Sequence, residues 1–204
     1  MKKYFVTGID TDSGKTLVSA ILCEMLQADY WKPIQAGYPT DRETVMSLVS
    51  NTKSKFHKEL FLLTEPMSPH AAAKIDGVSI TMDRLQCPDS ANALVIEGAG
   101  GCLVPINNTD FVIDIALKLQ AEVVLVADLY LGSINHTLLT VNLLRTKNAR
   151  VKGIIFNGEA NPESQEIILH HSRLPQLLHI NKEKSITPDL VSRYAGILKK
   201  SWHD

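Results

Sequence analysis

The chain contains 204 residues, of which 45% are hydrophobic and 21% are charged, and its formal net charge is -1. This composition is that of an ordinary globular domain, and the absence of a basic stripe argues against a nucleic-acid partner. No apolar run approaches the length of a membrane span, and the apolar residues before Gly8 are too few for a signal-peptide core. Three widely spaced cysteines indicate free thiols in a reducing compartment. We therefore expect one cytoplasmic domain over residues 1–204, without membrane or nucleic-acid contacts.

Short apolar runs alternate with helical patterns along the chain. The expected strands are residues 4–6, 30–31, 93–96, 123–126, 151–156 and 177–180. The expected helices are residues 16–27, 44–49, 111–119, 134–144, 162–171 and 188–200. Pro33 prevents the second run from continuing as a central strand, and residues 51–89 predict loops and short helices. Apolar strands that alternate with helices indicate a mainly parallel sheet with helices on both faces.

A glycine-bounded loop lies between the first strand and the first helix. Residues 8–16 read Gly-Ile-Asp-Thr-Asp-Ser-Gly-Lys-Thr, with five residues rather than the common four between the glycines. Such a loop turns backbone N–H groups towards phosphate oxygens, and the helix N-terminus adds a favourable dipole. Lys15 would reach the β and γ phosphates, and Thr16 would offer its hydroxyl to magnesium. The sequence therefore predicts ATP with Mg2+ as ligand, in a three-layer P-loop NTPase fold of the α/β class.

Three acidic residues are candidates for the magnesium site, because Mg2+ prefers carboxylates, waters and phosphate oxygens. Glu97 ends the apolar run 93–96, where ligands collect in parallel sheets. Asp10 lies inside the loop and Asp41 follows the second strand. Each also has an ordinary interpretation: a turn carboxylate for Glu97, a loop-bracing hydrogen bond for Asp10 and an exposed loop acid for Asp41.

Several motifs, in this order, resemble those of the dethiobiotin synthetases. They are the loop at 8–16 with its additional residue, Lys-Pro-Ile-Gln-Ala-Gly at 32–37, Ser-Pro-His-Ala-Ala at 68–72, Glu-Gly-Ala-Gly-Gly at 97–101 and Leu-Gly-Ser-Ile-Asn-His-Thr-Leu-Leu-Thr at 131–140. The similarity runs from Gly8 to about Asn157. It implies ATP-dependent ring closure of 7,8-diaminononanoate with CO2, giving dethiobiotin, ADP and phosphate through a carbamate and a carbamic–phosphoric anhydride.

The resemblance also assigns roles to individual residues. It places Lys15, Lys32 and Thr11 in catalysis. It places ATP against Gly8, Asp12, Ser13, Gly14, Lys15, Thr16, Leu17 and Asn157. It places the diamine substrate against Ala36, Gly100, Gly132 and Ser133, and magnesium against Thr16, Asp41 and Glu97. The loop around Gly132 would cross the two-fold interface of a homodimer.

Three positions depart from the family pattern and leave alternatives open. Ala36 stands where many members carry Ser or Thr, Ile9 replaces a Thr, and Asn181 replaces a Pro near the expected adenine pocket. ATP and CTP therefore both stay possible. The alternative function is a dimeric switch ATPase of the partition or septum-positioning type, although such proteins carry a further Lys where this chain has Gly8 and Ile9.

Overall fold

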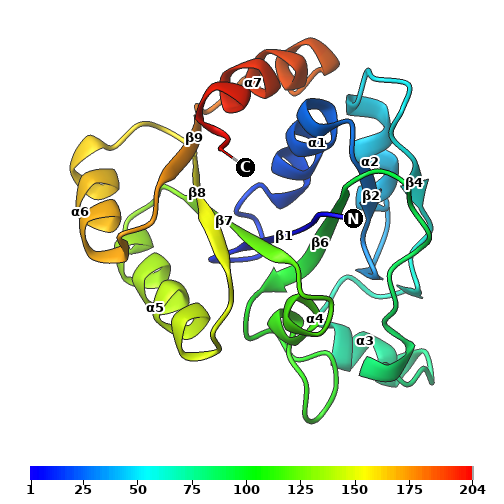
Figure 1. Ribbon diagram of the computed structural model, residues 1–204. Coiled ribbons are helices and arrows are strands. Elements are labelled where there is room, and N and C mark those ends of the chain that lie inside the picture. Colours follow the sequence, from blue (N-terminus) through cyan, green and yellow to red (C-terminus); the bar gives the residue numbers. More distant parts are fainter. Residues whose placement is uncertain (204) are drawn as a thin grey trace.

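The computed structural model describes residues 1–203 and is built around a parallel sheet of seven strands in the order β4-β2-β6-β1-β7-β8-β9 (Figure 1). These strands are β1 (Lys3–Gly8), β2 (Asp29–Trp31), β4 (Phe56–His57), β6 (Leu94–Gly101), β7 (Glu122–Asp128), β8 (Val151–Asn157) and β9 (Gln176–Ile180). A second, two-stranded parallel sheet contains β3 (Ile34–Ala36) and β5 (Phe61–Leu63).

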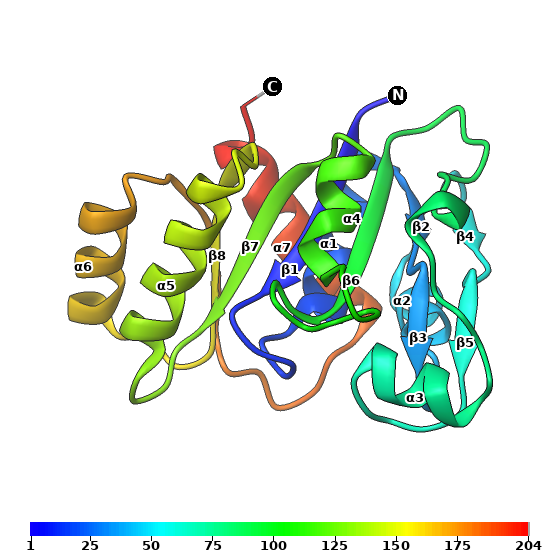
Figure 2. The same ribbon diagram turned by 90° about the horizontal axis from the view of Figure 1, so that it is seen from below.

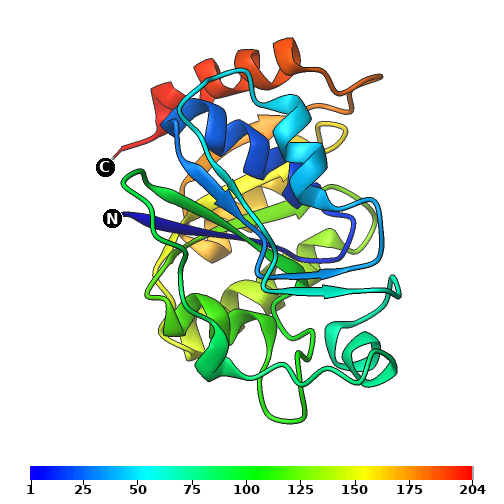
Figure 3. The same cartoon turned by 90° about the vertical axis from the view of Figure 1, so that its right-hand side faces the viewer.

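Helices cover both faces of the main sheet, which gives the three layers that the sequence predicted (Figures 2 and 3). One face carries α1 (Lys15–Leu26), α2 (Asp41–Leu48) and α7 (Pro188–Ser201). The other carries α4 (Val112–Lys118), α5 (Ser133–Thr146) and α6 (Pro162–Ser172). Helix α3 (Pro69–Ile75) packs against β3 and β5, and a short 3-10 helix spans Met82–Arg84. Within residues 1–203, no helix combines the length and the apolar character needed to cross a membrane.

Alternating residues of each strand serve two separate cores, which explains the continuous apolar runs in the sequence. Phe5 packs into the core beneath α4, whereas its neighbour Val6 packs into the core beneath α1. In β6, Ile96 belongs to the first core and Val95 to the second. Glu97, two residues after Val95, therefore lies on the α1 face of the sheet.

The predicted strands and helices are present, but two boundaries were wrong and two short strands were missed. Strand β6 continues through 97–101 instead of ending at Ile96, because glycines allow close packing there: a Cβ on Gly98 would lie 3.0 Å from Phe5. Helix α2 begins three residues early because Thr40 and Glu43 form a capping box. The region 51–89 holds β4 and β5, two and three residues long, too short to show a periodicity.

Pro33 ends the second strand as predicted. Strand β2 stops at Trp31, and the chain then leaves the main sheet to form β3 beside β5. Figure 2 shows the outer pair of strands beside the main sheet, next to α2 and α3. Lys32 is thus placed at the point where the two sheets separate.

Candidate active site at the carboxyl ends of the strands

The loop between β1 and α1 is braced from within. The Ser13 hydroxyl donates to the Asp10 carbonyl at 2.8 Å and accepts from the Asp10 N–H at 2.9 Å. From β8, the Asn157 side-chain amide donates to the Ser13 carbonyl at 3.0 Å. Gly14 has φ 95°, and a Cβ there would lie 2.4 Å from Asn157 Nδ2. Both the left-handed backbone and the close contact require glycine at this position.

Lys15 begins α1, and its side chain lies back over the loop. Its Nζ donates to the carbonyls of Asp10, at 3.0 Å, and Thr11, at 2.5 Å. Burial, followed by the positive charge of Lys32, lowers the pKa of Lys15. The ammonium is therefore held near backbone oxygens that an anionic ligand can replace as its partner.

Glu97 is the centre of the polar network at this end of the sheet. It is 1% exposed. Its Oε1 accepts from Thr16 Oγ1 and from Lys32 Nζ, each at 3.0 Å, and its Oε2 accepts from Tyr30 OH at 3.0 Å. Thr16 and Glu97, 81 positions apart in the sequence, therefore meet as the motif positions predicted.

Lys32 joins Glu97 to Asp41, the first residue of α2. The buried ammonium makes ion pairs with both carboxylates. Burial alone would lower the pKa of Lys32, but the charges of Glu97 and Asp41 outweigh burial and raise it. Lys32 is therefore held as a cation between two acids.

This network opens into a cavity of about 560 Å³. The cavity lies at the carboxyl ends of the strands, where ligands bind in open parallel sheets. The residues that line it and were predicted from the sequence are Thr11, Asp12, Gly14, Lys15, Thr16, Lys32, Ala36, Asp41, Glu97 and Gly100. The structure thus brings the predicted catalytic and metal-binding residues to one place, while their roles stay predictions.

Other predicted residues lie outside this cavity. Four residues predicted to bind ATP do not line the cavity: Gly8, Ser13, Leu17 and Asn157. Ser13 and Asn157 nevertheless hold in place the loop whose other residues line it. Gly132 and Ser133 line a separate hollow of about 340 Å³ between the start of α5 and residues 159–164. Within one chain, the structure therefore does not bring the Gly132 loop to Glu97.

Of the candidate acids, Asp10 has the ordinary role. Its side chain is exposed, and Oδ1 accepts from the Thr11 N–H at 2.7 Å, which is the loop-bracing alternative. Asp41 and Glu97 instead line the cavity together with Thr16. Two carboxylates and a hydroxyl suit Mg2+, which is usually bound by one or two carboxylates, waters and substrate phosphates. In residues 1–203 there is no group of three His, Cys, Asp or Glu that could hold a metal by itself.

Two residues that support the polar network, Gln35 and Tyr30, were not predicted as site residues. Gln35 accepts from the Asp41 N–H at 3.2 Å through Oε1 and donates to the Gly37 carbonyl at 3.2 Å through Nε2, so it connects β3 to the start of α2. Tyr30 donates to Glu97 from beneath. The prediction of residues 30–31 as a buried strand did not indicate a contact between Tyr30 and Glu97, because that contact depends on the register between β2 and β6.

The fold and this loop define the class of the protein. In P-loop nucleotide-binding proteins, the first strand of a parallel sheet leads through a glycine-bounded turn into a helix, as β1 and α1 do here. A family model described as an AAA domain matches residues 2–189. The ATP-dependent dethiobiotin synthetase BioD of Cytophaga hutchinsonii is 54% identical to this chain, covering 100% of both. The corresponding protein of Christiangramia forsetii is 44% identical, over 98% of this chain and 97% of its own. The chain belongs to the dethiobiotin synthetase family, as its motifs predicted.

Solved structures with this fold include the septum site-determining protein MinD of Pyrococcus horikoshii, in complex with Mg-ADP. It has a TM-score of 0.58 and 12% identity, covering 98% of this chain and 96% of that chain. A plasmid partition protein of Borrelia burgdorferi gives a TM-score of 0.54 at 10% identity, with 98% and 96% covered. Identity this low shows a shared fold only, and the full-length sequence relatives place the chain in the biosynthetic family rather than among the switch ATPases.

Proposed function

We propose that this chain closes the ureido ring of dethiobiotin from 7,8-diaminononanoate, CO2 and ATP. The observation that carries the proposal is the buried network of Thr16, Lys32, Asp41 and Glu97, which joins the phosphate loop to a cavity large enough for a second anion. A carbamate and a triphosphate repel each other, so a site that joins them needs positive charge between them. Two buried lysines at the same cavity meet that need.

We assign phosphate binding to the loop at residues 8–16 and to Lys15. The N–H groups at the start of α1 and the Lys15 ammonium would surround the β and γ phosphates, in exchange for the carbonyls of Asp10 and Thr11. Thr16, Asp41 and Glu97 are the residues that would hold Mg2+, which supplies positive charge between phosphate oxygens when bound. Thr11 lines the cavity beside Lys15 and Gly100, where it can contact the transferred phosphoryl group.

Lys32 is the residue that we assign to the reacting carbamate. One substrate amine adds to CO2 and gives the carbamate, whose oxygen then attacks the γ-phosphorus while the bond to ADP breaks. The Lys32 ammonium pairs with Glu97 and lines the same cavity as Lys15 and Ala36, so it can stabilise charge on both partners. The second amine then attacks the carbonyl carbon, and phosphate leaves as the ring closes.

We further propose that two copies complete the substrate site. Leu131 is fully exposed, and Tyr130, Ile134 and Leu139 expose 37 to 59% of their surfaces around the start of α5. Neighbouring exposed apolar side chains are typical of an interface. Gly132 and Ser133, which lie away from the cavity of their own chain, would then hold the substrate carboxylate across the two-fold axis. Light scattering should give twice the 22.6 kDa chain mass, and a monomer at assay concentration would contradict this proposal.

We place the reaction in the cytoplasm, and the free cysteines support a reducing compartment.

The decisive experiment mixes the protein with Mg-ATP, bicarbonate and 7,8-diaminononanoate and follows phosphate and the ureido product. Both should appear together and depend on the diamine. Phosphate release that ignores the diamine would contradict the proposal and favour a switch ATPase. Replacing ATP by CTP in the same assay tests the nucleotide.

A further inference from the structure

The hydrogen bond between Tyr30 and Glu97 is a buried contact that the proposed mechanism leaves unused. Tyr30 is fully buried and Glu97 is 1% exposed. Tyr30 pairs with Val95 in the parallel register of β2 and β6, and Glu97 follows Val95 by two residues on the same face. The tyrosine ring is packed in the core beneath α1 and α2 together with Val18. Its hydroxyl reaches Glu97 Oε2 at 3.0 Å, and Tyr30 is not among the residues that line the cavity.

The two oxygens of Glu97 consequently have different partners. Oε2 accepts from the Tyr30 hydroxyl, while Oε1 accepts from Thr16 and Lys32. The terminal torsion of a glutamate is broad and nearly two-fold, so it does not fix the carboxylate plane by itself. A phenol is protonated at neutral pH and a carboxylate has no proton to give, so the Tyr30 hydroxyl donates to Oε2.

We propose that Tyr30 is a positioning residue for the magnesium–nucleotide site: its hydroxyl fixes the plane of the Glu97 carboxylate and leaves Oε1 facing Thr16 and the cavity. This inference rests on the proposed function for its choice of ligand. Removing the hydroxyl leaves Oε2 buried without its donor, which favours rotation of the carboxylate towards other partners. Hydrogen-bond partners behind a metal ligand typically change affinity or activity by about 10- to 100-fold when they are lost.

The test measures metal binding without turnover. Mn2+ binding to wild-type protein and to Tyr30→Phe is followed by electron paramagnetic resonance in the presence of a non-hydrolysable ATP analogue. We expect Tyr30→Phe to weaken Mn2+ binding by about tenfold or more, and to raise the Mg2+ concentration for half-maximal turnover in parallel. Equal Mn2+ affinity in the two proteins would overturn the inference.

A matched control separates positioning from the loss of any buried hydroxyl. Tyr4 is 2% exposed in the neighbouring strand β1, and its ring packs edge-on against Trp202, whose centroid is 5.1 Å away. Tyr4→Phe should leave Mn2+ affinity within about twofold of wild type. In a Glu97→Gln background, Tyr30→Phe should add less than about twofold, because contacting residues couple in such cycles. An undiminished Tyr30→Phe effect in that background would also overturn the inference.

Two further outcomes are distinguishable. If wild-type protein binds the Mn2+–nucleotide complex but forms no ureido product, the proposed function fails and the affinity comparison still decides the role of Tyr30. If Tyr30→Phe does not fold, the test uses 19F NMR spectra of the chain with Tyr30 intact, labelled with 3-fluorotyrosine. The resonance that shifts in Glu97→Gln belongs to Tyr30, and it should shift again when Mg2+ and the analogue are added. A resonance that stays in place would contradict the inference.

Discussion

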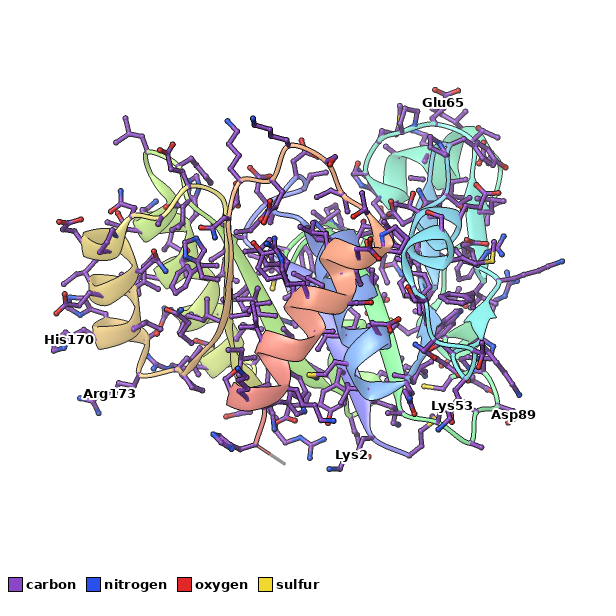
Figure 4. The ribbon with its side chains drawn as sticks, turned by 90° about the horizontal axis from the view of Figure 1, so that it is seen from above. Lys2, Lys53, Glu65, Asp89, His170 and Arg173 are labelled. Atoms are coloured by element: carbon purple, nitrogen blue, oxygen red, sulfur yellow. The ribbon has the colours of Figure 1, made fainter. Side chains whose placement is uncertain are left out.

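Two buried carboxylates of the same sheet have opposite surroundings. Glu97 lies in the middle of β6 and lines the cavity, whereas Asp29 begins β2 at the amino end of the sheet. Figure 4 labels residues near the two ends of the sheet. Glu65, which precedes the cavity-lining Pro66, lies at one end, and Lys53 and Asp89 lie at the other.

The surroundings of Asp29 are closed. Its oxygens accept from Ser90 Oγ at 2.7 Å, from Asn92 Nδ2 at 2.9 Å and from the Lys55 N–H at 2.9 Å, and His57 Nε2 lies 3.2 Å away. Burial alone would raise the pKa of Asp29, but the hydrogen bonds, with that of Asn92 the largest, lower it. This carboxylate fastens β2 to the loops around it and is not part of the lining of the cavity at Glu97.

Glu97 differs because two of its partners have a further task. Thr16 and Lys32 both line the cavity and can turn to a ligand. A buried charge held by fixed neutral donors stabilises the fold, whereas a buried charge held by groups at a cavity is available for binding. The type of donor around each buried carboxylate therefore supports a structural role for Asp29 and the proposed metal-binding role for Glu97.

The largest expected effect is that of Lys32→Ala, which tests the functional end. We expect kcat to fall by about 100- to 1000-fold, because a preorganised charge at the transferring phosphoryl group is lost, while KM for ATP changes less. Steady-state kinetics with Mg-ATP and the diamine measure both constants. An unchanged kcat would remove Lys32 from the chemistry and weaken the contrast with Asp29.

A smaller effect is expected at the structural end, from Asp29→Asn. The unfolding free energy should fall by about 1 to 3 kcal/mol, because charge-assisted hydrogen bonds become neutral and one amide hydrogen faces a donor. Urea denaturation measures the loss, and kcat should stay at the wild-type value. A loss of activity at a temperature where the variant is folded would mean that the two ends are not independent.

The smallest expected effect is the pH dependence of that stability. The pKa of Asp29 is lowered in the folded protein, so its contribution is present above its unfolded pKa of about 3.9 and is lost as the pH falls through the folded value. The stability difference between wild type and Asp29→Asn should therefore shrink as the pH is lowered from about 6 to about 3. A difference that grows on acidification would reverse the assigned sign.

Sequence reasoning located the functional end better than the structural one. Lys15 and Thr16 follow the glycine-bounded loop after β1, and Glu97 follows the apolar run 93–96, so their meeting could be predicted from the motifs and the topology. Asp29 and Tyr30 lie inside or at the start of a three-residue strand, and their partners come from distant loops or a neighbouring strand. Such contacts depend on strand register, which a single sequence does not specify.

The same limit applies to the fold. The strand β8 was predicted to within one residue, whereas β4 and β5 were missed because two or three residues carry no period. Gly14 was predicted as a loop glycine, but its contact with Asn157 was not. The resemblance assigns Asn157 to ATP binding, and its hydrogen bond to the Ser13 carbonyl is a structural contact that no motif indicates.

The departure of the chain from the main sheet at Pro33 has a consequence for evolution. The proposed triphosphate site is built on β1 and β6, while Gln35, Ala36 and residues 66–69 reach the cavity from the outer pair of strands or the segment that follows it. Under this proposal, substitutions in the outer layer can reshape the acceptor side without moving the backbone that would hold the nucleotide. Acceptor preference and energy coupling are therefore free to diverge at different rates among descendants of one ancestral scaffold.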